Sequence, residues 1–371
     1  MFKFIRSSTH LTKCSALATA ILLSACGGTD STLKTGDSEL NVAATQIIDN
    51  TIIPAANSFQ QQAGILVSDS AHFCSTNNLT ETNLATLQNQ WIETNLAWFQ
   101  LLPYRFGPMV NSLLLPTYTY IDGYRLRGTN YTASVRTKID SLLADTSTIN
   151  AATFSSSTFQ FVGLLALEVS LFEDAANQSK IKADIITEYQ SNPRKCQLLT
   201  GYANELLRRA DSIQQGWTTN YRDTNKSYRD LIINNQLDSV LEDEAVESAI
   251  KEITVSVQEY FDYLGLRDIT TDVSQISSSV WAAIGSSVTN IEELLSGTTN
   301  TTISLNQIMA NNRFEQTVAI LDENILTLRA ALDTMNTVDT VAAAKALDGN
   351  FKRDIPDALN INLGLNFSDG D

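Results

Sequence analysis

Apolar residues recur at helical spacing along most of the chain. Two stripes show this most clearly, with side chains three, four or seven residues apart: Leu84, Leu87, Trp91, Trp98 and Leu102, then Leu198, Tyr202, Leu206, Ala210 and Ile213. Such spacing places the apolar groups on one face of a helix, whereas the strict alternation typical of strands is hard to find. The pattern therefore predicts an all-α fold.

The long stripes and short connections favour two up-and-down helical bundles packed side by side. Residues 39–216 are predicted to form the first bundle and residues 217–371 the second, with the boundary near Trp217, where a long helix ends. Loops and short helices are expected in the Ser-, Thr- and Asn-rich segments 130–158 and 265–306. The predicted helices are 39–68, 80–103, 107–115, 132–145, 157–173, 180–216, 226–263, 304–334 and 337–347.

The first 25 residues have the order of a secretory signal: the cations Lys3, Arg6 and Lys13, then an apolar run, then small residues. The run is too short to span a bilayer. Residues 23–26, Leu-Ser-Ala-Cys, match the bacterial lipobox, so we expect cleavage before Cys26 and lipid on its sulfur. Residues 26–38 are then a flexible tether. This predicts an exported protein anchored to a membrane, with Gly27 favouring the periplasmic or surface face of the outer membrane.

The net charge limits which partners the chain can bind, and the cysteine count predicts a disulfide. Without its signal the chain has a net charge of about −19, which disfavours nucleic acid and makes a cation or a basic partner easier to recruit, although acidic surfaces also serve solubility. Cys14 leaves with the signal and Cys26 is lipidated. In an oxidising compartment the remaining pair, Cys74 and Cys196, predicts a disulfide.

Histidine is nearly absent from the mature chain. His10 lies in the signal, which leaves His72, interpreted as a structural or exposed residue. A Ser-His-Asp triad, a His-rich metal site or an HExxH helix each needs histidines that are missing here. These enzyme classes are therefore disfavoured.

One carboxylate lies on an apolar helical face. The helical neighbours of Glu168 three and four residues away are all apolar: Leu164, Leu165, Leu171 and Phe172. A buried carboxylate requires a partner or a raised pKa. Arg105, in the apolar segment 98–109, is the candidate partner, and an Arg105–Glu168 bridge between helices is predicted. Such a pair serves either fold specificity or a site, and the sequence leaves both open.

These residues carry a resemblance to the imelysin-like family, also called peptidase family M75. It rests on Trp91 and Trp98 followed by residues 105–108, Arg-Phe-Gly-Pro, on Gly163 to Glu168, on the cysteine pair, and on the ending 363–371. It covers essentially the whole mature chain as one unit, 39–371. The resemblance implies two helical bundles, a link to iron uptake and, in some members, peptidase activity.

The family motif GxHxxE is incomplete in this sequence. Gly163 and Glu168 match the motif, but Leu165 stands where the family has histidine. Leucine neither binds a metal nor transfers a proton, so the resemblance does not carry over a metallopeptidase centre. The residues themselves indicate no catalytic group and no cofactor, and iron is implied by the resemblance alone.

A ligand pocket between the two bundles is the remaining candidate site. Its predicted residues are Glu168, Arg105, Gly163, Trp98, Tyr104 and Phe106, which are equally compatible with ordinary core. Weak metal candidates are Glu168 and the tail residues Asp369 and Asp371, for which a solvated tail is the alternative. A polar, aromatic patch could border the same cleft or form an exposed loop: Tyr118, Tyr120, Asp122, Tyr124, Arg125 and Arg127.

These patterns and the resemblance together suggest three functions, of which the link to iron is implied by the resemblance alone. The first is a non-catalytic, lipid-anchored binding or accessory protein in iron uptake, whose partners are an iron species, a small ligand or peptide, and iron-uptake proteins. The second is a hydrolase with an atypical site, which requires a second acid near Glu168. The third is a structural adaptor lipoprotein without a small ligand.

Overall fold

The computed structural model describes residues 31–110, 115–123, 130–174, 177–237, 248–266 and 274–363, with side chains from residue 38 onward. Every secondary-structure element in these ranges is helical, which confirms the predicted all-α class. None of these helices combines the length and the apolar character that a membrane span needs.

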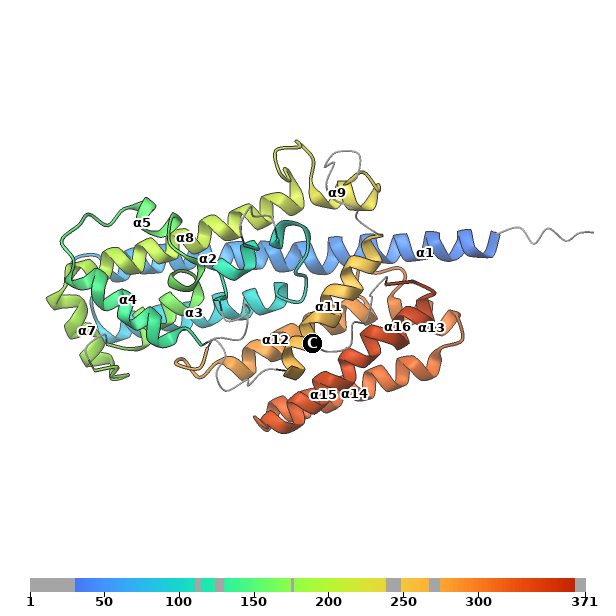
Figure 1. The fold of residues 1–371 in the computed structure, drawn as a ribbon. Helices are drawn as coiled ribbons and strands as arrows, with labels where there is room; N and C mark the ends of the chain where they lie inside the picture. The colour runs from blue at the N-terminus through green and yellow to red at the C-terminus, as the bar shows by residue number, and fades with distance from the viewer. Residues whose placement is uncertain are drawn as a thin grey trace, which may run out of the picture.

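The first half of the chain is built around α2, which packs against both α3 and α8. Their buried faces are the two stripes seen in the sequence, so Trp91 and Trp98 of α3 and Tyr202 of α8 are fully enclosed. Smaller helices cover this layer at one end (Figure 1). The helices are α2 (Ile53–Phe73), α3 (Glu81–Leu101), α4 (Thr132–Ala144), α5 (Ala151–Ser155), α6 (Leu164–Phe172), α7 (Lys182–Ser191) and α8 (Pro193–Thr218).

The second half is organised around α15, which packs against α11 and α14. Helix α12 contacts α14 on one side and α3 of the first half on the other, so one hydrophobic core runs through both halves. Figure 1 shows these helices in yellow to red beside the first half. They are α9 (Tyr228–Ile233), α11 (Ala249–Leu266), α12 (Val280–Ser296), α13 (Leu305–Asn311), α14 (Glu315–Asp333), α15 (Thr337–Gly349) and α16 (Ile355–Leu359).

A long helical segment links the two halves at the N-terminus. Helix α1 (Ser31–Ile47) continues through a π-helical turn (Ile48–Ile52) into α2, and α1 packs against α11 and α13 of the second half (Figure 1). The predicted tether 26–38 is therefore wrong from residue 31 onward, because those residues are helical. Cys26 and the signal lie outside the described residues.

Several predicted helices are interrupted or shifted. The predicted helix 180–216 is divided at Asn192, because Pro193 has no N–H to continue α7 and the Asn192 side chain caps α8 by accepting from the N–H of Arg194. The predicted helix 107–115 begins as a 3-10 turn at Gly107–Met109. The predicted helices 157–173, 226–263 and 304–334 each contain a break, before α6, between α9 and α11, and between α13 and α14.

Helix α12 lies inside the segment predicted to consist of loops and short helices. It is seventeen residues long, and Val280, Ile284, Ile291 and Leu295 are buried along it. These four lie at helical spacing, so the periodicity was present. The serine and threonine content, which lowers intrinsic helix propensity, masked it.

The predicted disulfide is confirmed. Cys74 at the C-terminal cap of α2 and Cys196 in the first turns of α8 are bonded, and they are separated by 122 residues in the sequence. Closing a loop of this length stabilises the fold by about 4–5 kcal/mol in the chain-entropy model. The bond fixes the start of α8 against α2.

Candidate functional site

Glu168 is buried in α6, as its apolar neighbours predict. Residues 164–171 are all buried, and Glu168 is 1% exposed. Helix α6 achieves this because it contacts α3, α4, α7 and α8 around its circumference. The carboxylate is thus withdrawn from water and depends on the protein for its hydrogen bonds.

Gly163 sets the start of α6. Its φ is +79°, and a Cβ built there would lie 2.4 Å from the carbonyl oxygen of Ile121 and 2.5 Å from that of Tyr120. A side chain is excluded both by the backbone conformation and by these carbonyls. The N–H of Leu164 donates to the same Ile121 oxygen at 2.9 Å. The motif glycine therefore has a steric role, which is to let segment 118–122 pack against α6.

The partners of Glu168 come from a serine turn, residues 274–279, just before α12. Oε2 accepts from the N–H of Ser274 at 3.2 Å, and Oε1 accepts from the N–H of Ser277 at 2.9 Å and from its hydroxyl at 2.8 Å. Ser274 is in turn held by Asn95 of α3, whose Nδ2 donates to the Ser274 hydroxyl at 2.7 Å. Glu168 thus connects α6 to the second half of the molecule.

The pKa of Glu168 is raised to about 7, chiefly by burial and to a smaller extent by the nearby charge of Glu173. The hydrogen bonds from Ser277 and Ser274 act in the opposite direction, because they favour the ionised form. The carboxyl therefore titrates near neutrality inside the protein. This property suits proton transfer as well as a structural role, so it does not by itself distinguish the two.

The predicted Arg105–Glu168 bridge is wrong. The Arg105 guanidinium pairs with Glu259 of α11 at 3.5 Å and lies over the Tyr118 ring, 5.5 Å from its centroid. Its backbone N–H donates to the Ser256 hydroxyl at 2.6 Å, which also directs residue 105 toward α11. Glu168 meets the serine turn instead, and the sequence contained no signal for that pairing.

The predicted aromatic lining lies in the core between elements. Trp98 and Tyr104 are fully buried, and Phe106 is 5% exposed. The Trp98 ring packs against Phe59. The Tyr104 hydroxyl donates to Oδ1 of Asn290 at 2.5 Å, which links the end of α3 to α12.

Phe106 packs edge-on against Trp217 and is likewise part of the core. The structure therefore brings Gly163 and Glu168 together on α6. It places Arg105 and Tyr104 against α11 and α12.

The polar, aromatic patch lies against α6 where it is described. Tyr118 and Tyr120 are half-buried and Asp122 is buried. Oδ2 of Asp122 accepts from the Trp98 indole N–H at 3.4 Å. Tyr124, Arg125 and Arg127 lie outside the described residues. The described part is thus neither a fully exposed loop nor separate from the motif, because the Tyr120 and Ile121 carbonyls meet Gly163.

The donor set around Glu168 does not fit a metal held in the manner of GxHxxE. Leu165, at the histidine position, is apolar and buried, and both Glu168 oxygens accept from the serine turn. Across the described ranges, no three His, Cys, Asp or Glu side chains are grouped to hold a metal ion. Asp369 and Asp371 lie outside those ranges. His72 lies near the end of α2 and its side chain approaches Asn78, which matches its interpretation as structural or exposed.

Sequence reasoning missed Asn95, Ser274 and Ser277. The serine-rich run 274–279 was a visible signal for a polar turn, but nothing in it named Glu168 as its partner. Asn95 lies between the apolar residues of α3, so the sequence did not indicate its bond to Ser274. Its Oδ1 atom is buried without a hydrogen-bond partner among the described residues.

Comparison with known proteins agrees with this architecture. A crystal structure of an imelysin-like protein from Psychrobacter arcticum matches with a TM-score of 0.61 at 16% identity, covering 88% of this chain and 98% of that one. A putative iron-regulated protein A precursor from Parabacteroides distasonis matches with a TM-score of 0.64 at 11% identity, covering 87% and 95%. Curated proteins give no significant match. The imelysin family model, Peptidase_M75, matches residues 52–359, and the chain belongs to this family.

Proposed function

We propose that this chain is an exported, lipid-anchored and non-catalytic imelysin, acting as a binding or accessory protein in iron uptake. The anchor is the lipid on Cys26, in the lipobox that follows the signal. The proposal carries no peptidase step, because the residues at the family motif do not supply one.

The observation that carries the non-catalytic part is the state of Glu168. Its two oxygens accept three hydrogen bonds from the serine turn, and Leu165 replaces the motif histidine. A general base must lie within reach of substrate, and a metal ion needs several ligands around it. Glu168 is 1% exposed, and no three His, Cys, Asp or Glu side chains of the described residues are grouped to hold a metal ion. In this chain the motif glutamate is a positioning residue that holds the two halves together.

The iron part is supported by the family and by one neighbour. The Parabacteroides protein with the same fold is named as iron-regulated. The strongly acidic composition, with 41 acidic against 25 basic residues, favours encounters with cationic species over anionic ones. Both features suit a protein that meets iron or its carriers outside the cytoplasm.

The test is iron uptake by the source bacterium after deletion of the gene, under iron limitation. We expect uptake of labelled ferric citrate to fall and to be restored by the wild-type gene but not by Cys26→Ser, which cannot be lipidated. Cys14→Ser, the same substitution at a cysteine that leaves with the signal, is the matched control and should restore uptake.

Unchanged uptake in the deletion strain would overturn the iron role. Full restoration by Cys26→Ser would overturn the requirement for the anchor. Hydrolysis of a peptide library by the purified wild-type chain, abolished by Glu168→Gln, would replace the accessory function with the hydrolase alternative.

A further inference from the structure

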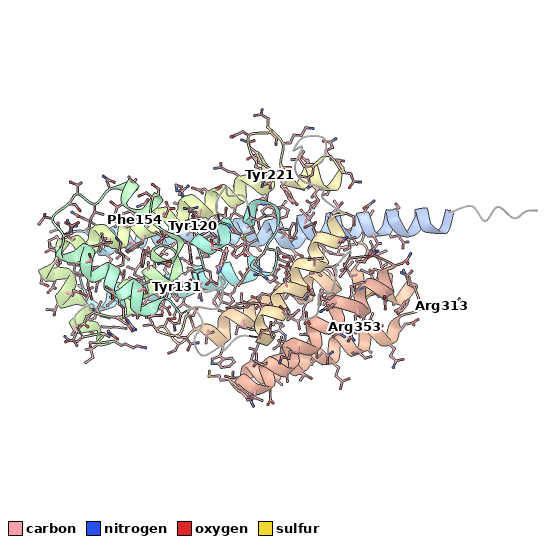
Figure 2. All side chains as sticks on the ribbon, viewed as in Figure 1. Tyr120, Tyr131, Phe154, Tyr221, Arg313 and Arg353 are labelled. Carbon is pink, nitrogen blue, oxygen red and sulfur yellow. A yellow bond between two sulfur atoms is a disulfide. The ribbon has the colours of Figure 1, made fainter. Side chains whose placement is uncertain are left out.

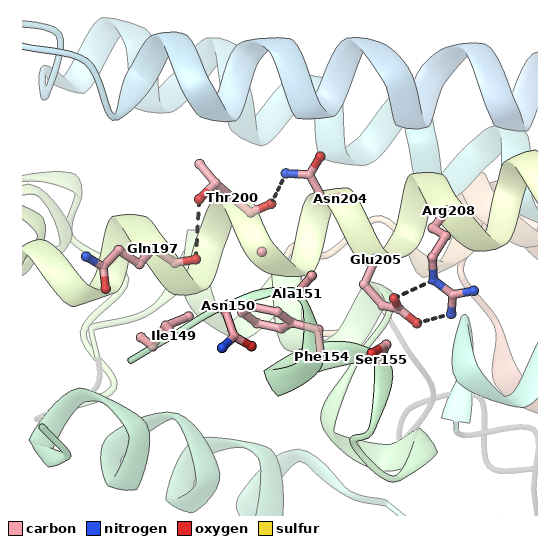
Figure 3. Close-up of a pocket in the computed structure, with 11 residues that line it drawn as sticks. Ile149, Asn150, Ala151, Phe154, Ser155, Gln197, Thr200, Asn204, Glu205 and Arg208 are labelled. Atoms are coloured by element: carbon pink, nitrogen blue, oxygen red, sulfur yellow. Dashed lines mark hydrogen bonds and ion pairs between the residues drawn. The ribbon is translucent and has the colours of Figure 1, made fainter. Parts of the chain in front are cut away.

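A cavity of about 570 Å³ lies away from Glu168, between the short helix α5 and the first half of α8 (Figure 3). Residues 149–155 form one wall, and the face of α8 from Gln197 to Arg208 forms the other. Its volume falls within the range of about 300–1,000 Å³ that is typical of small-molecule sites.

The floor of this α5–α8 cavity is fixed by close packing. Phe154 lies against Gly201, where a built Cβ would come within 2.0 Å of the ring, and its ring meets Tyr202 edge-on. Figure 2 labels Phe154 and Tyr120 in the first half of the molecule. Asn150 caps α5 by accepting from the N–H groups of Ala152 and Thr153. The cavity is therefore formed by a structured segment with an apolar floor.

An ion pair occupies one end of the cavity. The buried Glu205 carboxylate accepts from Nε and Nη2 of Arg208, at 2.8 and 2.6 Å (Figure 3). It also accepts from Nε of Arg209 at 2.8 Å. Arg209 does not line the cavity and lies over the Tyr120 ring. The charges that line the cavity are thus one carboxylate and one guanidinium, which sum to zero.

Several polar groups around the cavity retain hydrogen-bonding capacity. Arg208 is 53% exposed and its Nη1 has no partner among the described residues, nor do the Gln197 amide and the Ser155 hydroxyl. Asn204 uses its Nδ2 on the Thr200 carbonyl, which leaves Oδ1 as an acceptor. Both donors and acceptors are therefore available around the cavity.

The polar lining continues beyond the first cavity. A second cavity of about 450 Å³ shares Arg208 and extends along α8 through Asp211 to Gln215 and the following loop. From Gln197 to Gln215 the helix rises about 27 Å at 1.5 Å per residue. A ligand that uses both cavities is therefore a chain of several units.

We propose that this groove binds a neutral oligosaccharide. Sugar hydroxyls both donate and accept, which matches amides, a hydroxyl and a guanidinium–carboxylate pair. The apolar ring face of a sugar fits the apolar wall of Ile149 and Ala151, which lies beside the buried Phe154. The two cavities together are lined by three carboxylates, Glu205, Asp211 and Asp223, and by two guanidinium groups, Arg208 and Arg222, so no excess of positive charge favours an anionic chain. An extended peptide is disfavoured because the described residues offer no strand edge for it to pair with.

The test is calorimetric titration of the full-length lipidated chain, in a detergent without sugar groups, with cellotetraose, maltotetraose and acetylated chitotetraose. We expect saturable binding of at least one probe. Arg208→Ala and Gln197→Ala should each weaken it about 10-fold, as expected for one lost hydrogen bond at the site. Ala151→Trp, at an exposed position on the wall, should abolish it by filling the cavity.

The matched control is Gln214→Ala, which removes a glutamine of the same helix that lines neither cavity and should leave affinity unchanged. Circular dichroism checks that each variant is folded. Absence of heat with all three neutral probes, tighter binding of an acidic oligosaccharide or a peptide, or binding that survives Ala151→Trp would each overturn the proposal.

Discussion

The carboxylates of Glu168 and Glu205 are both buried, yet their surroundings differ. Glu168 accepts all its hydrogen bonds from the serine turn and lies between elements of the two halves. Glu205 is held by two arginines at the edge of a cavity where several other polar groups, among them the Gln197 amide, retain hydrogen-bonding capacity. Burial and a perturbed pKa therefore mark Glu168 as important, but available hydrogen-bonding capacity marks the α5–α8 cavity as the place for a ligand.

Gly163→Ala should have the largest effect, because it disrupts the packing that places Glu168. The φ of +79° and the carbonyls at 2.4 and 2.5 Å leave no space for a methyl group. We expect a loss of about 3 kcal/mol or more in unfolding free energy, measured by urea denaturation. Gly285→Ala on α12, where a built Cβ meets nothing within 4 Å, is the control and should be neutral or stabilising. Equal effects would contradict the steric role of Gly163.

Glu168→Gln should change how stability depends on pH. The folded pKa of about 7 lies above the ordinary 4.5, so between these values the native state binds more protons than the unfolded state. The contribution of Glu168 is thus present below pH 4.5 and is lost as pH rises to 7, by about 3 kcal/mol at most.

The glutamine variant lacks this loss. The unfolding free energy of the wild type minus that of the variant should therefore fall from pH 5 to pH 8, as followed by urea denaturation at both values. A difference that grows with pH would show that the folded pKa of Glu168 is lowered, and would contradict burial as the dominant cause.

Ser277→Ala tests the serine turn directly. It removes the hydroxyl that donates to Oε1 of Glu168 at 2.8 Å, while the backbone N–H remains. A hydrogen bond to a charged group contributes about 1.5–3 kcal/mol, so we expect a loss in that range at pH 8, where the carboxylate is ionised. Ser155→Ala at the rim of the cavity removes an exposed hydroxyl and should cost less than about 0.5 kcal/mol. Equal losses of unfolding free energy in Ser277→Ala and Ser155→Ala would contradict the role of the serine turn.

Arg208→Ala should have the smallest effect on stability. Its side chain is 53% exposed, and Glu205 keeps its bond to Arg209 when Arg208 is removed. An exposed ion pair contributes about 0–1 kcal/mol, so thermal unfolding should shift by only a few degrees. A loss as large as that of Gly163→Ala would mean that Arg208 holds the fold together and does not serve the cavity.

The stripes on α3 and α8 show how much of the fold the sequence predicts. Their apolar spacing predicted which faces are buried, and the cysteine count predicted the disulfide, because both depend on local pattern or simple counting. The division at Pro193 and helix α12 were missed, since the first depends on one N–H and the second on a periodicity masked by serine and threonine. The first is a local effect of Pro193, whereas tertiary packing of its apolar face explains α12.

The candidate site was predicted only in part, because its burial follows from local spacing but its pairings do not. The apolar neighbours of Glu168 predicted its burial, and the substitution by Leu165 is visible in the sequence itself. Its pairing with a turn more than 100 residues away is a tertiary property that spacing does not encode, and the same holds for Arg105 and Glu259. The α5–α8 cavity depends on Gly201 meeting Phe154, which no sequence pattern indicated.

The central claim is that Glu168 positions the two halves and does not bind a metal or a substrate. Titration of the full chain with ferric citrate and divalent metals, comparing wild type with Glu168→Gln, tests it most directly. We predict that the two proteins give the same heats, whether or not iron binds elsewhere on the chain. Saturable binding by the wild type that is lost in a folded Glu168→Gln variant would contradict the account and place the ligand at the family motif.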